Sequence, residues 1–214
     1  MKERPILFSA PMVRAILDGR KTVTRRAVKN QPTLESDEWV LDAGGTGKWM
    51  ASGPSPATGG TRQTWGWAPC PYGQPGDRLW VRETFAVYGD QKMCAIHYRA
   101  DRPHHVGMKG MGYKPSIHMP RWVSRILLEI TDVHVERLHD ISEEQALAEG
   151  IVGVAFRPDD GWPICTGYMV GPDDGKTGLQ TTAAKAFAGL WDSVGGDWDG
   201  NPWVWVVEFK RVTP

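Results

Sequence analysis

The sequence has few cysteines, no net charge and no long apolar run. Three cysteines in 214 residues are too few for the disulfide framework of a small secreted protein and suit a reducing compartment. Basic and acidic residues number 25 each, so binding to nucleic acid would need a local basic cluster. The apolar stretch after Met1–Pro5 is too short for a signal peptide or a membrane span. We expect a cytoplasmic protein with no membrane contact.

Metal-binding patterns are also missing from the sequence. Its 6 histidines lie neither beside a Cys-x-x-Cys pair nor in a His-Glu-x-x-His helix. We therefore predict no metal and no cofactor, and the residues alone leave the oligomeric state open.

Short β-branched runs alternate with turn residues along most of the chain. Strands are predicted at 5–8, 79–85, 94–99, 125–137 and 203–212, with a bulge at Thr131–Asp132. Helices are predicted from Pro11 to Gly19, from Ser142 to Gly150 with a capping box, and over 181–194. This pattern favours an α+β fold, with a small β-barrel flanked by helices, over 1–214 as a single domain.

Two segments rich in glycine, proline and polar residues interrupt this pattern. They cover about 30–75 and 155–178, and we expect both to be long loop insertions.

The octet Gly19-Arg20-Lys21-Thr22-Val23-Thr24-Arg25-Arg26 is the most informative stretch. It places an amine, a hydroxyl and three guanidiniums just after a predicted helix end. An amine and a hydroxyl this close can form a base and nucleophile pair, and arginines suit an anionic ligand. The alternative is that the octet is simply a basic turn exposed to solvent, since such a turn would have the same composition.

The octet resembles the signature Gly-x-Lys-x-x-Glu-x-Arg of the ASCH family, small PUA-like β-barrels associated with RNA and modified nucleosides. Gly19, Lys21 and Arg26 match it, and Thr24 replaces the glutamate. Compact N4-acetylcytidine amidohydrolases of this family have a threonine there, with a lysine three residues earlier and a glutamate in a distant short helix. Glu149 is the matching glutamate. The resemblance implies a catalytic set of Lys21, Thr24 and Glu149.

Three further stretches are similar to the longer ASCH proteins of bacteriophages and prophages. They are Pro71–Phe85, Tyr98–Asp101 and Pro115–Trp122. This broader resemblance covers nearly the full length of the chain.

The proposed chemistry is hydrolysis of the exocyclic amide of an acylated cytosine. A threonine hydroxyl needs a base, and a lysine serves as one only when burial or nearby cations lower its pKa. Arg20, Arg25 and Arg26 act in that direction. Glu149 acts against it, so Glu149 could instead activate water while Lys21 stabilises the oxyanion. The sequence leaves these roles open.

Further candidates for substrate contacts lie in loops and at strand ends. Trp122 could stack on a base and Arg121 could contact a phosphate, beside His118. Arg82 and Glu83 alternate on a predicted strand, so one of them could face the barrel mouth.

Two functions from different classes follow from these observations. One is an amidohydrolase of N4-acylated cytidine or a similar nucleoside. The other is a non-enzymatic reader, or a ribonuclease, that uses the same basic turn to hold RNA or a modified base. The expected partner is accordingly a small nucleoside or an RNA ligand.

Overall fold

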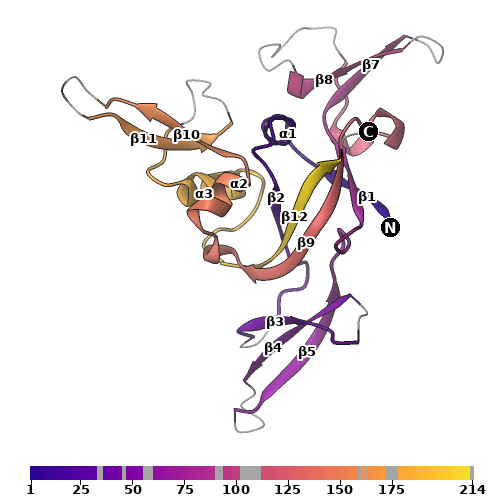
Figure 1. Cartoon of the computed structure of the whole chain (residues 1–214), viewed down its shortest axis with the longest axis vertical. Helices are drawn as coiled ribbons and strands as arrows, with labels where there is room; N and C mark the ends of the chain where they lie inside the picture. Colours follow the sequence, from indigo (N-terminus) through magenta and orange to yellow (C-terminus); the bar gives the residue numbers. More distant parts are fainter. Residues whose placement is uncertain are drawn as a thin grey trace.

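A five-stranded mixed sheet forms the centre of the molecule, in the order β1-β6-β9-β12-β2 (Figure 1). These strands span, in that order, Glu3–Leu7, Arg78–Arg82, Leu127–Arg137, Trp203–Val212 and Val23–Ala27. β1 pairs with β6 in parallel, and the other neighbours are antiparallel. The computed structural model describes residues 1–32, 36–44, 47–54, 60–89, 94–101, 112–158, 161, 163–171 and 178–212.

Three antiparallel units project from this sheet in different directions (Figure 1). The first is a three-stranded sheet of β3 (Glu38–Leu41), β4 (Lys48–Pro54) and β5 (Arg62–Pro69). The second is the hairpin of β7 (Phe85–Gly89) and β8 (Cys94–Tyr98), and the third is the hairpin of β10 (Ile151–Phe156) and β11 (Cys165–Val170). Short 3-10 helices η2 to η5 span Arg99–Asp101, Ser116–His118, Arg121–Val123 and Leu138–Asp140.

The α-helices form where the sequence predicts them. α1 spans Ala10–Leu17 with a proline in its first turn, and Gly19 follows it with a positive φ of 74°. α2 spans Glu143–Ala148 and has the predicted capping box of Ser142 and Gln145. α3 spans Ala183–Ser193. The predicted helices are therefore confirmed to within a few residues.

The central sheet is covered on both faces, which is why β12 is apolar at consecutive positions. Trp203, Trp205, Val207 and Phe209 face a core shared with α1, β1 and β6. The alternate residues Val204 and Val206 face a second core with α2 and α3. The predicted bulge is confirmed, because the pairing of β12 with β9 passes from Asp132 to Ile130 and skips Thr131.

The α+β class is confirmed, but among the described strands no sheet closes into a barrel. The edge strands β1 and β2 are not hydrogen-bonded neighbours in the central sheet. Instead, the Arg26 guanidinium on β2 donates a 3.0 Å hydrogen bond to the Leu7 carbonyl on β1. We call the space between β1 and β2 the seam. The Arg26 side chain spans it, whereas in a closed barrel the two strands would pair through their backbones.

The prediction of two long loop insertions is wrong for most of the residues that the structure describes. The first segment contains β3, β4 and β5, and the second contains β11. Two tryptophans of the first segment anchor it to the central sheet: Trp39 and Trp49 each pack on Trp205 with ring centroids 6.2 Å apart. Parts of both segments lie outside the described residues: 33–35, 45–46, 55–59, 159–160, 162 and 172–177.

The single strand predicted at 79–85 is wrong, because these residues belong to two strands. β6 ends at Arg82 and β7 begins at Phe85, so Glu83 and Thr84 form the corner between the central sheet and a hairpin. Within the described residues, no helix is both long and apolar enough to cross a membrane.

Candidate active site

A pocket of about 460 Å³ lies at the seam between the two edge strands. β1 and the start of α1 contribute residues 5–9 and Met12, and β2 contributes residues 25–27. The remaining lining comes from the octet turn, the connection between β5 and β6, the C-terminal end of α2, and α3 with the turn after it. Those residues are Lys21, Tyr72, Glu149, Phe187, Leu190, Trp191, Val194, Gly195 and Gly196.

Lys21 is held at this pocket by the turn that follows α1. Its backbone N–H donates to the Ala15 carbonyl at 3.0 Å, and only 1% of its side chain is exposed. Nζ lies 2.7 Å from the Val23 carbonyl, 2.9 Å from the Glu149 carbonyl and 2.5 Å from Glu149 Oε2. An ammonium has three N–H donors, so these three acceptors satisfy all of them.

Glu149 reaches Lys21 because α2 ends in a glycine turn. Glu149 is the C-cap residue, and Gly150 follows with a positive φ of 101°. A Cβ at position 150 would lie 3.0 Å from the Ala15 Cβ and 3.5 Å from the Lys21 Cβ. Only glycine therefore lets the end of α2 pack this closely on the octet turn.

A second cation completes the surroundings of the Glu149 carboxylate. Arg25, whose side chain is fully buried, places Nη1 3.4 Å from Glu149 Oε1. The same guanidinium pairs with Glu136 on β9 at 2.7 Å. Glu136 in turn lies 3.5 Å from His134 Nε2, and His134 Nδ1 lies 2.9 Å from Asp132.

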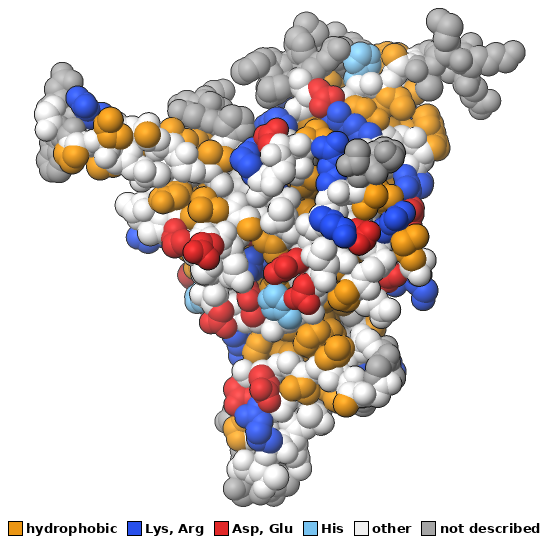
Figure 2. Space-filling model, in the orientation of Figure 1, with side chains coloured by type: hydrophobic (Ala, Val, Ile, Leu, Met, Phe, Trp, Pro, Cys, Tyr) orange, Lys and Arg blue, Asp and Glu red, His pale blue; other side chains and the backbone are white. Residues whose placement is uncertain are grey.

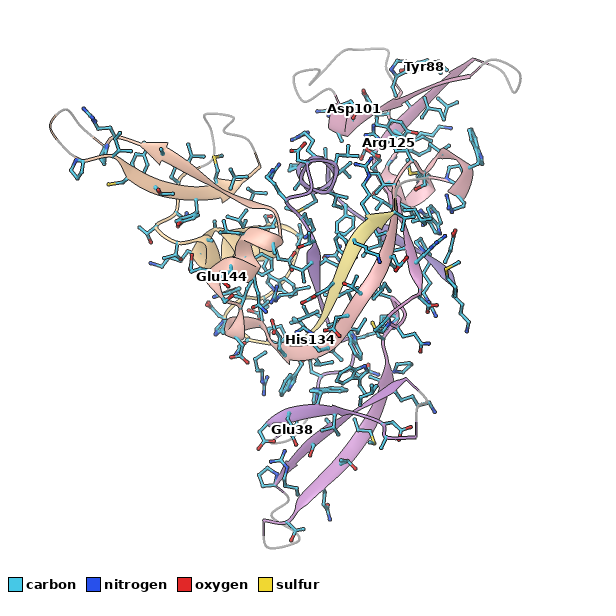
Figure 3. The ribbon with its side chains drawn as sticks, viewed as in Figure 1. Glu38, Tyr88, Asp101, Arg125, His134 and Glu144 are labelled. Atoms are coloured by element: carbon cyan, nitrogen blue, oxygen red, sulfur yellow. The ribbon has the colours of Figure 1, made fainter. Side chains whose placement is uncertain are left out.

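This chain of alternating charges runs from the pocket to the surface. Figure 3 labels His134 on β9, and Figure 2 shows acidic side chains gathered around a histidine at that place. A hydrogen bond with Glu136 raises the pKa of His134, and Asp132 raises it further against the effect of burial. Burial opposes ionisation of Glu136, but its contacts with His134 and Arg25 lower the pKa of this carboxyl overall.

Burial lowers the pKa of the Lys21 ammonium from its ordinary value of 10.5. Glu149 acts against this shift, while the charges of Arg26 and Arg25 add to it. The sequence predicts both influences. Since three acceptors surround Nζ, the geometry itself fits the protonated form as a hydrogen-bond donor.

Thr24 lies next to this pair but does not contact it through its hydroxyl. Its side chain is fully buried, and Oγ1 has no hydrogen-bond partner among the described residues. Thr24 pairs with Val207 on the first core face, whereas Arg25, the next residue of β2, reaches Glu149. The described lining of the pocket includes Arg25 and Arg26 but not Thr24.

The walls of the pocket combine aromatic rings with one further cation. The Arg26 guanidinium lies 5.4 Å from the centroid of the Phe8 ring, and Lys21 Nζ lies 5.5 Å from it. Tyr72 and Trp191 add two more rings. Flat apolar walls with a few charged groups suit a planar, partly polar ligand such as a nucleobase.

Six other predicted contact residues lie outside the described lining of the pocket. Arg20 pairs with Asp18 at 2.8 Å on the surface. The Arg82 guanidinium donates to the Met119 and Ile117 carbonyls, so it secures a loop. His118 lies exposed in η3.

Arg121 and Trp122 lie in η4, also outside the described lining of the pocket. Arg121 pairs with Glu3 at 3.0 Å, and Trp122 is 65% exposed.

Glu83 belongs to a separate buried ion pair. Both of its oxygens accept hydrogen bonds from Arg125, at 2.9 and 3.1 Å, and Arg125 also bridges to Asp101 (Figure 3). Burial raises the pKa of Glu83, although Arg125 opposes that shift.

Sequence reasoning missed several residues of the site. Arg25 was expected only as a cation near Lys21, and its contact with Glu149 was missed, although strand alternation puts Arg25 on the face opposite Thr24, where Glu149 lies. Glu136, Tyr72 and Trp191 carry no local signal, because they are far from the octet in the chain and only the fold brings them near it.

Among the described residues, no group of three or more His, Cys, Asp or Glu side chains could hold a metal ion. Comparison of the chain with protein-family models, with curated proteins and with solved structures finds no match in any of the three.

Proposed function

We propose that this chain is an amidohydrolase that acts on an N4-acylated cytidine or a similar modified nucleoside, within an ASCH-type, PUA-like domain. One observation carries the proposal: the buried contact of 2.5 Å between Lys21 and Glu149 on the wall of a pocket with aromatic sides. These two residues come from opposite parts of the chain and are two of the three that the family resemblance names.

In the proposed reaction, water adds to the acyl carbonyl and the bond between this carbon and N4 breaks. The products are cytidine and a carboxylic acid. Glu149 takes the proton of the attacking water and returns it to the departing amine. Lys21, which keeps its proton, stabilises the negative charge that develops on the carbonyl oxygen. The Arg25 guanidinium lies 3.4 Å from the second oxygen of the Glu149 carboxylate and helps to hold it in place.

Thr24 offers a second route through an acyl-enzyme. Within the described part of the chain its hydroxyl has no hydrogen-bond partner, as a nucleophile awaiting substrate would have none, but Thr24 lies on the strand face away from Arg25. The resting geometry therefore favours water as the nucleophile. Thr24→Val removes the hydroxyl with little change of shape, so it separates the two routes.

The test is incubation with N4-acetylcytidine, followed by the ultraviolet change that accompanies its conversion to cytidine. We expect Lys21→Met and Glu149→Gln each to lower kcat by at least about 100-fold. Arg20→Met is the matched control, because Arg20 belongs to the same octet but pairs with Asp18 on the surface. Full activity in either site variant would refute the assigned roles. Two results together would establish the acyl-enzyme route. Thr24→Val would lose activity, and hydroxylamine would trap the acyl group when it is added to the unmodified protein during the reaction.

One observation favours the non-enzymatic reader as a second candidate. Every N–H of Lys21 and both oxygens of Glu149 already have partners, as in a purely structural ion pair. Complete inactivity towards N4-acetylcytidine, together with salt-dependent RNA binding, would support the reader and refute the amidohydrolase.

A further inference from the structure

Among the described residues that line the pocket, Arg26 is the cation without a carboxylate partner. Lys21 is paired with Glu149, and Arg25 lies between Glu149 and Glu136. The Arg26 guanidinium instead donates to two backbone carbonyls, at 3.1 and 3.0 Å. These bonds use two of its five N–H donors, and because a carbonyl is uncharged they leave the charge of the guanidinium unbalanced.

The described lining of the pocket therefore carries an excess of positive charge. It includes three cations, Lys21, Arg25 and Arg26, but a single carboxylate, that of Glu149. Glu136 balances Arg25 from outside this lining, so one positive charge remains. The neighbouring side chains feel this charge: burial raises the pKa of the Tyr72 hydroxyl, and Arg26 opposes that rise. An anion beside Arg26 would balance the charge of the pocket.

The guanidinium of Arg26 is within reach of a ligand. The residue is partly exposed, and the hydrogen bond from its Nη2 to the Leu7 carbonyl lies at the surface. The Arg26 Cζ lies 5.4 Å from the centroid of the Phe8 ring, and Lys21 Nζ lies 5.5 Å from the same centroid. The two cations therefore lie near one ring of the pocket wall, and a single ligand can contact both.

We propose that Arg26 forms an anion subsite that binds a phosphate group of the ligand, so that the pocket takes a nucleotide rather than a nucleoside. The planar guanidinium offers parallel N–H donors to phosphate oxygens and stays charged at all working pH values. This inference rests on the proposed function and refines its substrate class. The acylated cytosine would lie at Lys21 and Glu149, and the phosphate of the same nucleotide at Arg26. A mononucleotide and an RNA chain share this chemistry, so both are tested.

The experiment measures Kd by calorimetry for three ligands that carry the same base. They are cytidine, cytidine 5′-monophosphate and the dinucleotide CpC, whose phosphate is a diester as in RNA. At least one of the two phosphate ligands should bind about 10-fold or more tightly than cytidine, the usual effect of a hydrogen bond to a charged group. This preference should shrink when the salt concentration rises from about 50 mM to about 500 mM. The ligand that is preferred identifies the source of the phosphate.

A variant assigns the preference to Arg26. Arg26→Met should reduce it to below about twofold, because the apolar side chain has no charge or N–H donor for the phosphate. Arg20→Met is the matched control, since Arg20 belongs to the same octet but pairs with Asp18 on the surface. This control should keep the full preference.

Because Arg26 also spans the seam, a measurement on the unmodified chain accompanies the variant. The Nε–H resonances of the ¹⁵N-labelled chain are followed by NMR during titration, and the Arg26 resonance is identified by its loss in Arg26→Lys. It should shift with the preferred phosphate ligand and stay in place with cytidine. The Arg20 resonance should move with neither.

The outcomes separate this inference from the proposed function. Equal Kd values for the three ligands, or a preference that survives in Arg26→Met, overturn the inference even in a chain that hydrolyses N4-acetylcytidine. An Arg26 resonance that does not move at saturating phosphate ligand also overturns it. A preference that is lost in Arg26→Met supports it, even if no hydrolysis occurs and the amidohydrolase proposal fails.

Discussion

The Lys21–Glu149 pair should make a large and specific contribution to stability, which a double-mutant cycle can measure. Both side chains are almost fully buried, at 1% and 3% exposure, and their charged atoms are 2.5 Å apart. Removing one partner of a buried pair strands the other charge, which typically costs 3–5 kcal/mol. We use the lower end of that range, because Arg25 remains near Glu149 and two carbonyls remain near Lys21.

The expected values follow from this choice. Lys21→Met and Glu149→Gln should each lower the free energy of unfolding by about 3 kcal/mol. The double variant has no stranded charge between these two positions, so it should lose only about 3–4 kcal/mol in total. The coupling energy of the cycle is then about 2–3 kcal/mol.

Urea unfolding followed by circular dichroism gives the four free energies, with unchanged m-values as the check that the same transition is measured. The Arg20–Asp18 pair is the matched control, since its atoms are 2.8 Å apart but the side chains are 35% and 57% exposed. Its coupling should stay below about 0.5 kcal/mol. A coupling below about 1 kcal/mol at the buried pair, or no difference from the exposed one, would contradict the argument.

Three further predictions concern the supports of the site and the rest of the fold. Gly150→Ala should lower the free energy of unfolding by about 2 kcal/mol or more in urea, because the new Cβ makes a close contact at a residue whose φ is already unfavourable for alanine. Gly19→Ala is the control. It also has a positive φ, but its Cβ would meet no atom within 4 Å, so it should cost only about 1 kcal/mol. Arg125→Met should lower the free energy of unfolding by about 3 kcal/mol at neutral pH, since it strands the buried Glu83 carboxylate, and a Glu83→Gln background should remove most of that loss. The pKa of His134 is raised in the folded chain, so protonated His134 should stabilise the fold. This contribution should be complete below about pH 6.5 and should be lost as the pH rises through the folded-state pKa. His134→Gln should remove this pH dependence from the free energy of unfolding measured between about pH 5.5 and 9.

Local signals in the sequence predict the helices and the centre of the sheet well. The Ser142–Gln145 capping box, the glycines after α1 and α2, and the alternating residues of β12 each depend on neighbouring positions, which the sequence displays directly. Even the bulge at Thr131 follows from a local loss of alternation.

The projecting sheet of β3, β4 and β5 could not be predicted in this way. β4 and β5 each contain a glycine, a proline and several polar residues, a composition that is typical of loops. What orders the described part of this unit is contact with the main body, where Trp39 and Trp49 pack on Trp205. A tertiary contact of this kind overrides local preference and has no signature in a single sequence.

For the site, the family resemblance names three residues that should meet, but it does not say which way each side chain points. It places Lys21 beside Glu149, and the structure has that contact. It also places the Thr24 hydroxyl beside Lys21, yet alternation along β2 turns that hydroxyl toward Val207 and brings Arg25 to Glu149 instead. The exposed candidates failed to join the site because their cations found carbonyl or carboxylate partners nearby, as Arg82 did.

The open seam of the central sheet explains why the charged groups gather where they do. An edge strand has unpaired backbone groups, and a closed barrel would satisfy them through pairing that leaves no space between its strands. Here the seam is spanned by the Arg26 side chain, which reaches the Leu7 carbonyl, and a pocket forms beside it. β2 therefore presents two arginines in succession, one toward the seam and one toward the second core. Each extra cation near Lys21 has to be balanced, and Glu149 and Glu136 are the two acids that balance them. If backbone pairing closed this seam, the pocket would have no space, so the open seam and the candidate site are one structural feature.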